Sequence, residues 1–223
     1  MADRRFPIVT GEFYHIFNRG VARQPTFLNK KDYQQALLGL SYYRFKNPPV
    51  KLSRFKEFAV DEREKILTGL QKMADLHVKI ISFVFMPNHF HFLLQQTLDN
   101  GIPNFIGKFT NSYTKYFNTK EERVGPVFQG VYKAVHVLSD EQLIHLSRYI
   151  HLNPVVSGVI RESELMIYPW SSFPDFLQGK SSVVSLDLVL NQFSSSEDYK
   201  KFVFDQIEYA KKLEEIKHLI LED

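Results

Sequence analysis

A predicted β-hairpin over residues 78–96 is the feature that most constrains the fold of this chain. Its first strand, 78–86, has the dense apolar sequence Val-Lys-Ile-Ile-Ser-Phe-Val-Phe-Met. Pro87 and Asn88 follow as a turn, because proline fixes φ at the first turn position and asparagine suits the second. A second apolar strand follows directly, so the two strands are expected to pair as antiparallel neighbours.

The second strand of this hairpin carries two histidines one residue apart, His89 and His91. Side chains alternate across a strand, so both imidazoles share one face, and the apolar residues between and after them take the buried face: Phe90, Phe92 and Leu94. Two adjacent imidazoles can hold one divalent metal ion. The alternative is a histidine pair that water or neighbouring side chains satisfy.

The other hydrophobic periodicities place this hairpin inside a larger order of elements. They predict a strand over 11–20, helices over 32–43, 61–76 and 102–118, a strand over 127–137 and a helix over 139–152. The main order, strand–helix–strand–strand–helix–strand, is that of the ferredoxin-like fold. We therefore expect an α+β protein, in which an antiparallel sheet has helices on one face and offers the other face to a ligand.

The C-terminal part is expected to form a helical extension. An aromatic stretch at 168–174 is expected to pack back on the sheet domain, and helices are predicted over 186–193 and 197–220. The predicted division is a catalytic domain over 1–178 and a helical extension over 179–223. An apolar stripe on the last helix suits either an interface between copies or packing within the chain.

Composition excludes several classes of protein and favours nucleic acid as a partner. The chain has no cysteine, which excludes disulfides, cysteine catalysis and cysteine-type zinc sites. No apolar run approaches the roughly 18 residues of a membrane span, and the N-terminus lacks a signal-peptide core, so a cytoplasmic protein is expected. Residues 1–60 carry eleven Lys or Arg against four Asp or Glu. A basic, aromatic-rich segment suits DNA, although an ordinary solvated surface has the same composition.

The predicted helix over 139–152 brings a second set of polar residues to one face. Ser139 is a suitable N-cap, with acids in the first turn and a glutamine three residues later. Polar side chains then recur at spacings of three or four, which places them along one stripe: Gln142, His145, Tyr149 and Asn153. Pro154 is expected to end the helix, because the residue before proline disfavours helical backbone.

Five motifs in order resemble one known family, the single-tyrosine transposases with a His-hydrophobic-His motif, especially the REP-associated tyrosine transposases. The motifs cover most of residues 11–174: Tyr14-His-Ile-Phe-Asn-Arg-Gly20, Met86-Pro-Asn-His-Phe-His91, Gly125-Pro-Val-Phe-Gln-Gly130, Arg148-Tyr-Ile-His-Leu-Asn-Pro154 and Tyr168-Pro-Trp-Ser-Ser172. Residues after about 180 lie outside the resemblance.

The resemblance implies metal-dependent cleavage and joining of single-stranded DNA, next to a short hairpin, in the cytoplasm at the nucleoid. By analogy with the family, Tyr149 would be the nucleophile that forms a 5′-phosphotyrosine, and His89, His91 and Asn153 would bind the catalytic metal. Two imidazoles and an amide suit Mn²⁺, Ni²⁺ or Zn²⁺ better than Mg²⁺, but phosphate and water oxygens make Mg²⁺ workable. The expected cofactor is therefore Mg²⁺ or Mn²⁺.

Other residues are candidates for supporting roles. Phosphate or base contacts are expected from Arg19, Lys108, Arg123, Gln129 and Lys133. His15 and His145 are candidates for supporting the metal ligands, with simple packing as the alternative. Tyr113 and Tyr116 are rival nucleophiles, although a core or stacking role suits both better.

Alternative functions stay open at this stage. A replication initiator or relaxase-like nickase uses the same paired histidines and tyrosine, but 223 residues leave little room for a helicase domain. A metal-dependent hydrolase would need additional carboxylate ligands, and none follows a recognisable spacing. A DNA-binding regulator that keeps the fold is the third alternative. The family includes monomers and dimers, so a homodimer is also open.

Overall fold

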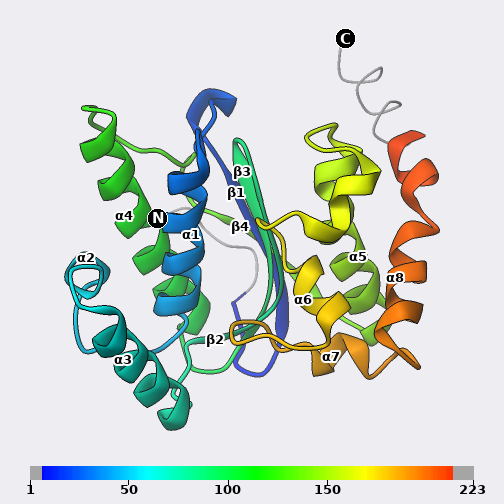
Figure 1. The fold of residues 1–223 in the computed structure, drawn as a ribbon, viewed down its shortest axis with the longest axis horizontal. Coiled ribbons are helices and arrows are strands. Elements are labelled where there is room, and N and C mark those ends of the chain that lie inside the picture. The colour runs from blue at the N-terminus through cyan, green and yellow to red at the C-terminus, as the bar shows by residue number, and fades with distance from the viewer. Residues whose placement is uncertain (1–6, 213–223) are drawn as a thin grey trace.

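A four-stranded antiparallel sheet, in the order β2-β3-β1-β4, forms the centre of the molecule (Figure 1). The computed structural model describes residues 7–212. The strands are β1 (Phe13–Arg19), β2 (Val78–Met86), β3 (His89–Gln96) and β4 (Lys133–Val137). β2 and β3 form the predicted hairpin, and the sheet order with its intervening helices is ferredoxin-like, so the predicted α+β fold is confirmed.

Helices α1 (Lys30–Tyr43) and α4 (Gly101–Lys120) pack against each other on one face of the sheet. The Asn29 side chain begins α1 by accepting hydrogen bonds from two free N–H groups of its first turn. The short α2 (Leu52–Phe55) and α3 (Val60–Met73) lie outside this layer and close a small apolar cluster of their own, which includes Tyr42 and Leu70.

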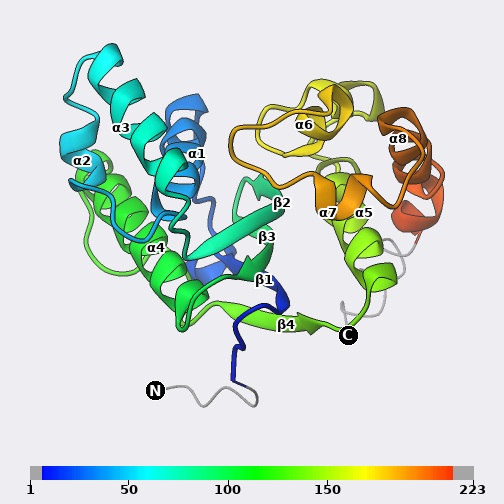
Figure 2. The same cartoon turned by 90° about the horizontal axis from the view of Figure 1, so that it is seen from below.

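Helix α5 (Asp140–Val156) lies on the opposite face of the sheet, against β2 and β3. It is followed by η2 (Glu162–Ile167), α6 (Phe173–Gln178), α7 (Asp187–Leu190) and α8 (Ser196–Phe204). Figure 2 shows the sheet between these two groups of helices, with α1 to α4 on one side and α5 to α8 on the other. The face predicted to be left for a ligand is thus partly covered by α5, and the candidate site lies between α5 and the sheet.

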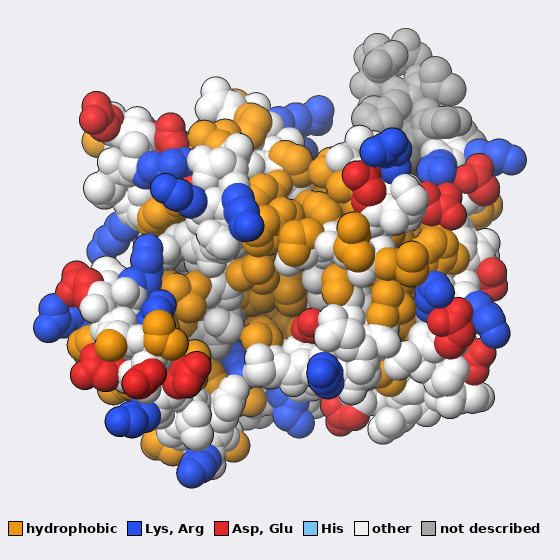
Figure 3. Space-filling view, viewed as in Figure 1, with side chains coloured by type: hydrophobic (Ala, Val, Ile, Leu, Met, Phe, Trp, Pro, Cys, Tyr) orange, Lys and Arg blue, Asp and Glu red, His pale blue; other side chains and the backbone are white. Residues whose placement is uncertain are grey.

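The outer edge of β2 is covered by the chain itself. In the loop after η2, the Trp170 carbonyl accepts a hydrogen bond of 2.8 Å from the Phe85 N–H. In the segment before α7, the Ser185 N–H donates to the Ile80 carbonyl at 2.8 Å. These segments follow β2 as an additional, irregular strand would, and they occupy its free backbone groups. Figure 3 shows hydrophobic side chains gathered between the two groups of helices, with Lys and Arg side chains around them.

Two predicted boundaries are wrong for identifiable reasons. β4 begins at Lys133 rather than at 127, because the chain turns at Gly130, whose φ angle is +54°. α5 continues through Pro154 to Val156. Proline removes one hydrogen-bond donor from the last turns, but this side chain is buried, so its packing offsets part of that cost.

The C-terminal helices are shorter than predicted. Within 186–193 only α7 is helical. The helix predicted over 197–220 is α8 followed by a turn at 205–206 and renewed helix over 207–212. Residues 213–220 of that prediction lie outside the described part of the chain. In residues 7–212, no helix combines the length and the apolar character that a bilayer crossing requires.

Candidate active site

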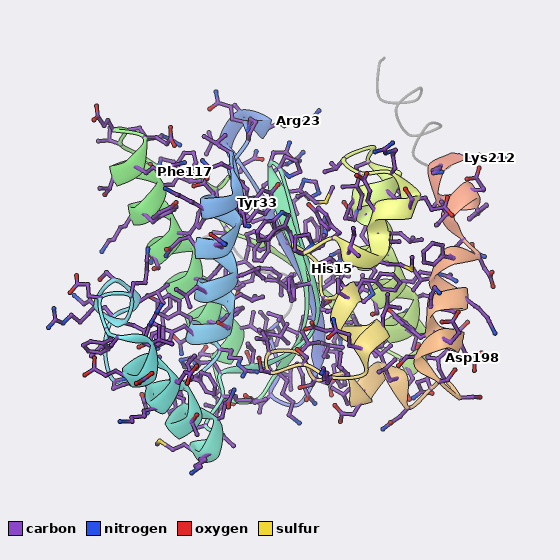
Figure 4. The ribbon with its side chains drawn as sticks, in the orientation of Figure 1. His15, Arg23, Tyr33, Phe117, Asp198 and Lys212 are labelled. Carbon is purple, nitrogen blue, oxygen red and sulfur yellow. The ribbon has the colours of Figure 1, made fainter. Side chains whose placement is uncertain are left out.

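The paired histidines project from β3 toward α5. In the β1–β3 register, His91 lies opposite Phe17, and His89 lies opposite Arg19. Directly opposed residues of an antiparallel pair share a face, so all four side chains project to the same side of the sheet. Figure 4 shows His15 on this side of the sheet, facing α5 and α6.

His91 is held by a neighbouring histidine on β1. Its Nδ1 lies 2.8 Å from Nε2 of His15, and the two rings stack with centroids 5.0 Å apart. Phe17 also stacks on the His91 imidazole, with ring centroids 5.5 Å apart. These contacts fix the ring of His91 and leave its Nε2 as the nitrogen that can meet a ligand. His15 therefore occupies the supporting position that the sequence proposed for it.

His89 lies between two asparagine side chains. Its Nδ1 is 2.6 Å from Oδ1 of Asn88, and its Nε2 is 3.4 Å from Oδ1 of Asn153. The Asn88 amide is oriented by donation from its Nδ2 to the Arg23 carbonyl at 3.0 Å. The His89 ring stands edge-on to His91, with centroids 5.0 Å apart and an angle of 89° between the planes.

Tyr149 of α5 lies beside the imidazole rings of His91 and His15. Its ring centroid is 5.6 Å from that of His91 and 6.1 Å from that of His15, both edge-on, and 46% of the residue is exposed. Asn153 follows one turn later on the same helix, and the unbroken helix through Pro154 keeps it in line with Tyr149. The structure thus brings together the four residues predicted for the catalytic centre.

The lone pairs of His89 and Asn153 are arranged as ligands of one cation would be. A neutral imidazole carries a single N–H. At Nδ1 that N–H serves Asn88, and the lone pair of Nε2 then faces the Asn153 oxygen, another acceptor, at 3.4 Å. Two ligands of one cation, each about 2.1 Å from it, lie roughly 3.0 to 3.4 Å apart in octahedral or tetrahedral geometry. A cation between these atoms would replace the repulsion of two lone pairs with two favourable bonds.

Carboxylates of residues 7–212 do not contribute to this cation site. Among residues 7–212, no three His, Cys, Asp or Glu side chains are grouped as ligands of one ion. The residues that could hold a cation are therefore His89, His91 and Asn153, and its remaining positions would be open to water or phosphate oxygens.

Burial keeps the imidazoles of the site neutral. Desolvation lowers the pKa of His91 well below its ordinary value, and it lowers the pKa of His15 to about 4. Burial also lowers the pKa of His89, and the nearby charge of Arg19 lowers it further; the hydrogen bond that only a protonated Nε2 could donate to Asn153 raises it. Neutral imidazole is the form that binds metal ions, so near pH 7 the histidines are ready to act as ligands.

The predicted DNA contacts divide into two groups. Three lie around the histidine face: Arg19 is opposite His89, Lys133 is opposite Phe17, and the Gln129 N–H donates to the Arg19 carbonyl at 2.7 Å. The other two lie elsewhere. Lys108 is on α4, where its Nζ donates to the Lys46 carbonyl at 3.1 Å, and Arg123 follows α4 and donates to the Pro126 carbonyl at 3.0 Å. The structure does not bring Lys108 or Arg123 to the histidines.

The rival tyrosines belong to the opposite helical layer. Tyr113 is buried and donates its hydroxyl hydrogen bond to the Thr26 carbonyl, and burial raises its pKa above the usual range. The Tyr116 hydroxyl is 2.9 Å from the Asp32 carboxylate. Both lie on α4, across the sheet from His89 and His91. His145, the other supporting candidate, pairs instead with Arg148, one turn along α5, at 2.6 Å.

A buried polar network behind α5 was not predicted from the sequence. His151 is fully buried, with Nδ1 2.8 Å from the Tyr199 hydroxyl of α8 and Nε2 2.8 Å from the Ser172 hydroxyl. The Tyr199 hydroxyl also lies 2.8 Å from Ser147. The network connects the helix that carries Tyr149 to the aromatic loop and to the C-terminal helices. Residues two apart on a helix lie nearly opposite each other, so His151 points away from Tyr149, and no local sequence pattern identifies its partners.

A cavity of about 290 Å³ opens beside three of the four candidate residues. His89, Tyr149 and Asn153 line it from β3 and α5. The chain beyond α8 forms another part of its wall, through Gln206, Tyr209 and Ala210. The C-terminal extension, which lies outside the motifs of the sequence, thus borders the candidate site.

Comparison with known proteins agrees with this geometry. Residues 52–153 match the model of the IS200-like transposase family, and this segment contains all four candidate catalytic residues. A solved structure of a REP-associated tyrosine transposase bound to a REP hairpin has a similar fold, with a TM-score of 0.52, 16% sequence identity, and coverage of 87% of this chain and 96% of that chain. No curated protein matches the sequence. The resemblance to single-tyrosine transposases expected from the motifs is confirmed.

Proposed function

From the similarity to IS200-like transposases, we propose that this protein is a metal-dependent DNA endonuclease and strand transferase. It cleaves single-stranded DNA near a hairpin, with Tyr149 as nucleophile. The observation that carries the proposal is the meeting of the Tyr149 phenol with the His89–His91 pair between α5 and the sheet. The Tyr149 phenol is half exposed, so a substrate can reach it, which a buried tyrosine with a purely structural role would not allow.

The proposed reaction exchanges one phosphoester for another. Oη of Tyr149 attacks the phosphorus of a DNA phosphodiester, a bond forms between that oxygen and phosphorus, and the bond from phosphorus to the 3′ oxygen breaks. The phenol proton ends on the departing 3′ hydroxyl, so the step consumes no co-reactant. The DNA remains attached through its 5′ phosphate. Attack on this linkage by a 3′ hydroxyl then joins strands without ATP.

A divalent cation, Mg²⁺ or Mn²⁺, would polarise the phosphorus as a Lewis acid when bound. His89, His91 and Asn153 would hold it. Asn88 and His15 orient the two imidazoles from behind, as partners of metal-binding histidines usually do. Because these partners restrain the rings before a ligand arrives, little ordering is left to occur during the reaction.

The DNA would cross the sheet face beside the histidines. Arg19 and Lys133 project to this face from β1 and β4, where their charges can meet phosphates. Gln129 can add a hydrogen bond. The hairpin partner is proposed from the REP hairpin in the similar structure. One chain supplies both the phenol and the histidines, so the reaction does not require a homodimer, which remains a prediction. Action on DNA suits a cytoplasmic location.

The experiment that tests the proposal is a search for a covalent adduct. The protein is incubated with labelled single-stranded DNA that carries a hairpin, in Mn²⁺ or Mg²⁺, and the products are separated on a denaturing gel. A labelled protein–DNA adduct is expected from the wild type and is expected to disappear in Tyr149→Phe, because the variant lacks the attacking oxygen.

Two control variants make the result specific. Tyr209→Phe changes an exposed tyrosine at the same cavity and should still form the adduct. Tyr113→Phe tests the rival nucleophile. An adduct that survives in Tyr149→Phe but vanishes in Tyr113→Phe would assign the nucleophile to α4 and overturn the proposal.

A further inference from the structure

The wall that the C-terminal extension contributes to the catalytic cavity has the character of a base-binding surface. The Tyr209 side chain borders the cavity, and 61% of the residue is exposed. The cavity is also lined by aliphatic side chains of α5 and of the extension, namely Leu152, Val156 and Ala210. An exposed aromatic ring beside aliphatic walls suits a flat, apolar ligand face.

Polar groups border the same cavity. Gln206 contributes an amide, with donor and acceptor atoms, and Ser157 contributes a hydroxyl. A nucleobase has this combination of features, since both of its faces stack and its edges hydrogen-bond. A phosphate would instead favour a wall of cations. Among the described residues that line the cavity, Arg148 is the one Lys or Arg, and its guanidinium contacts the carbonyl and the ring of Phe202, while the residues that the extension contributes are uncharged.

Direct contacts hold this wall against the catalytic helix. Nη1 of Arg148, the residue before Tyr149, donates to the Phe202 carbonyl at 3.2 Å, and its guanidinium lies 4.1 Å from the centre of the Phe202 ring. Ile207 is buried at 2% exposure between the cavity residues Gln206 and Tyr209. The position of the extension is therefore tied to the residue next to the proposed nucleophile.

We propose that Tyr209 and Gln206 form a subsite for the nucleobase adjacent to the scissile phosphate. Tyr209 stacks on the base, and the Gln206 amide meets its edge. The inference rests on the proposed function, because the cavity is a DNA site only if Tyr149 attacks DNA. It assigns the extension a role in substrate recognition in addition to its packing against α5.

The test crosses a protein change with a DNA change. Tyr209→Ala removes the ring, and an abasic nucleotide on one side or the other of the cleavage point removes the base. Stacking of one base on an aromatic side chain corresponds to roughly 5- to 150-fold in affinity. In the wild type, an abasic site at one of the two positions should weaken kcat/KM by this factor. In Tyr209→Ala, intact DNA should be cleaved more slowly by a similar factor, and the abasic site should add little.

The same comparison is made by fluorescence anisotropy in the Tyr149→Phe background, where binding is measured without cleavage. This separates failure of the subsite from failure of the proposed chemistry. Tyr209→Phe keeps the ring and should retain the abasic penalty, which tests whether stacking is the interaction. Glu208→Ala, at a solvent-facing neighbour, serves as the control. The proposal would be overturned if the abasic site weakened binding equally with and without Tyr209, or if it did not weaken binding at either position. Gln206→Ala should alter which base is preferred at the sensitive position.

Discussion

Tyr199→Phe should destabilise the protein, although it removes one oxygen atom and leaves the aromatic ring in place. The lost hydroxyl connects His151 of α5 with Ser147 of the same helix, each at 2.8 Å. Burial raises the pKa of Tyr199 above its usual range, so the hydroxyl is protonated at any ordinary pH. The variant therefore isolates the hydrogen bonds of the buried network without opening a cavity.

The cost follows from what the two partners can do afterwards. His151 is fully buried, so the variant leaves its Nδ1 unsatisfied at a cost of about 1 to 3 kcal/mol. Ser147 can bond to a carbonyl one turn earlier in its own helix, which reduces its loss to about 0.5 to 1 kcal/mol. The expected decrease in the free energy of unfolding is about 1.5 to 4 kcal/mol.

Urea unfolding of the wild type and the variant, followed by circular dichroism, measures this decrease. The midpoint should fall while the slope with urea stays the same, because the folded state keeps its surface. Tyr209→Phe removes an exposed hydroxyl and should leave the midpoint unchanged. A loss below about 0.5 kcal/mol for Tyr199→Phe would show that the network is not what holds α8 to α5, and the reasoning about His151 would be wrong.

Three further predictions follow from the site and its surroundings. Saturation with Mn²⁺ should stabilise the wild type, by about 2.7 kcal/mol at one hundred times the dissociation constant, and Asn153→Ala should reduce this shift in thermal melting; equal shifts would remove Asn153 from the ligand set. Burial lowers the pKa of His151 to about 3, below the value of about 6.5 in the unfolded chain, so the unfolded state takes up a proton first as pH falls. The free energy of unfolding should then fall below pH 6.5, by up to about 1.4 kcal/mol per pH unit from this residue. Urea midpoints measured between pH 7 and 5, with a chelator present to remove metal ions, would stay constant if the reasoning is wrong. Lys133→Gln should lower the salt dependence of single-stranded DNA binding by about 0.7 in the log–log slope; an unchanged slope would place the DNA away from β4.

The elements with strong periodicity were predictable from the sequence. The hairpin over 78–96, the first strand and the two helices of the first layer follow from local patterns of apolar residues, because each buries one face against the same sheet. β4 is shorter than its apolar pattern suggests, since the left-handed conformation of Gly130 interrupts the predicted strand. Pro154 misled the prediction of the helix end, because burial of that residue is a tertiary property.

The candidate site was predictable in its members but not in its supporting contacts. Spacing placed Tyr149 and Asn153 on one helical face, and the structure puts that face against the histidines. The contact between His15 and His91 depends on strand register, and the network of His151 depends on α8, 48 residues away in sequence from this histidine. Neither has a local pattern. The roles of the site residues and the division at residue 178 remain predictions.

The covered edge of β2 limits how copies of this chain can associate. An open strand edge invites pairing with another chain, but segments around Trp170 and Ser185 already occupy the backbone groups of β2. Only β4, five residues long, ends the sheet without a neighbouring strand in the described part of the chain. Any assembly that continues the sheet from one subunit to the next would have to begin at β4, next to the surface where Lys133 is proposed to meet DNA, so oligomerisation by that route and substrate access would be coupled.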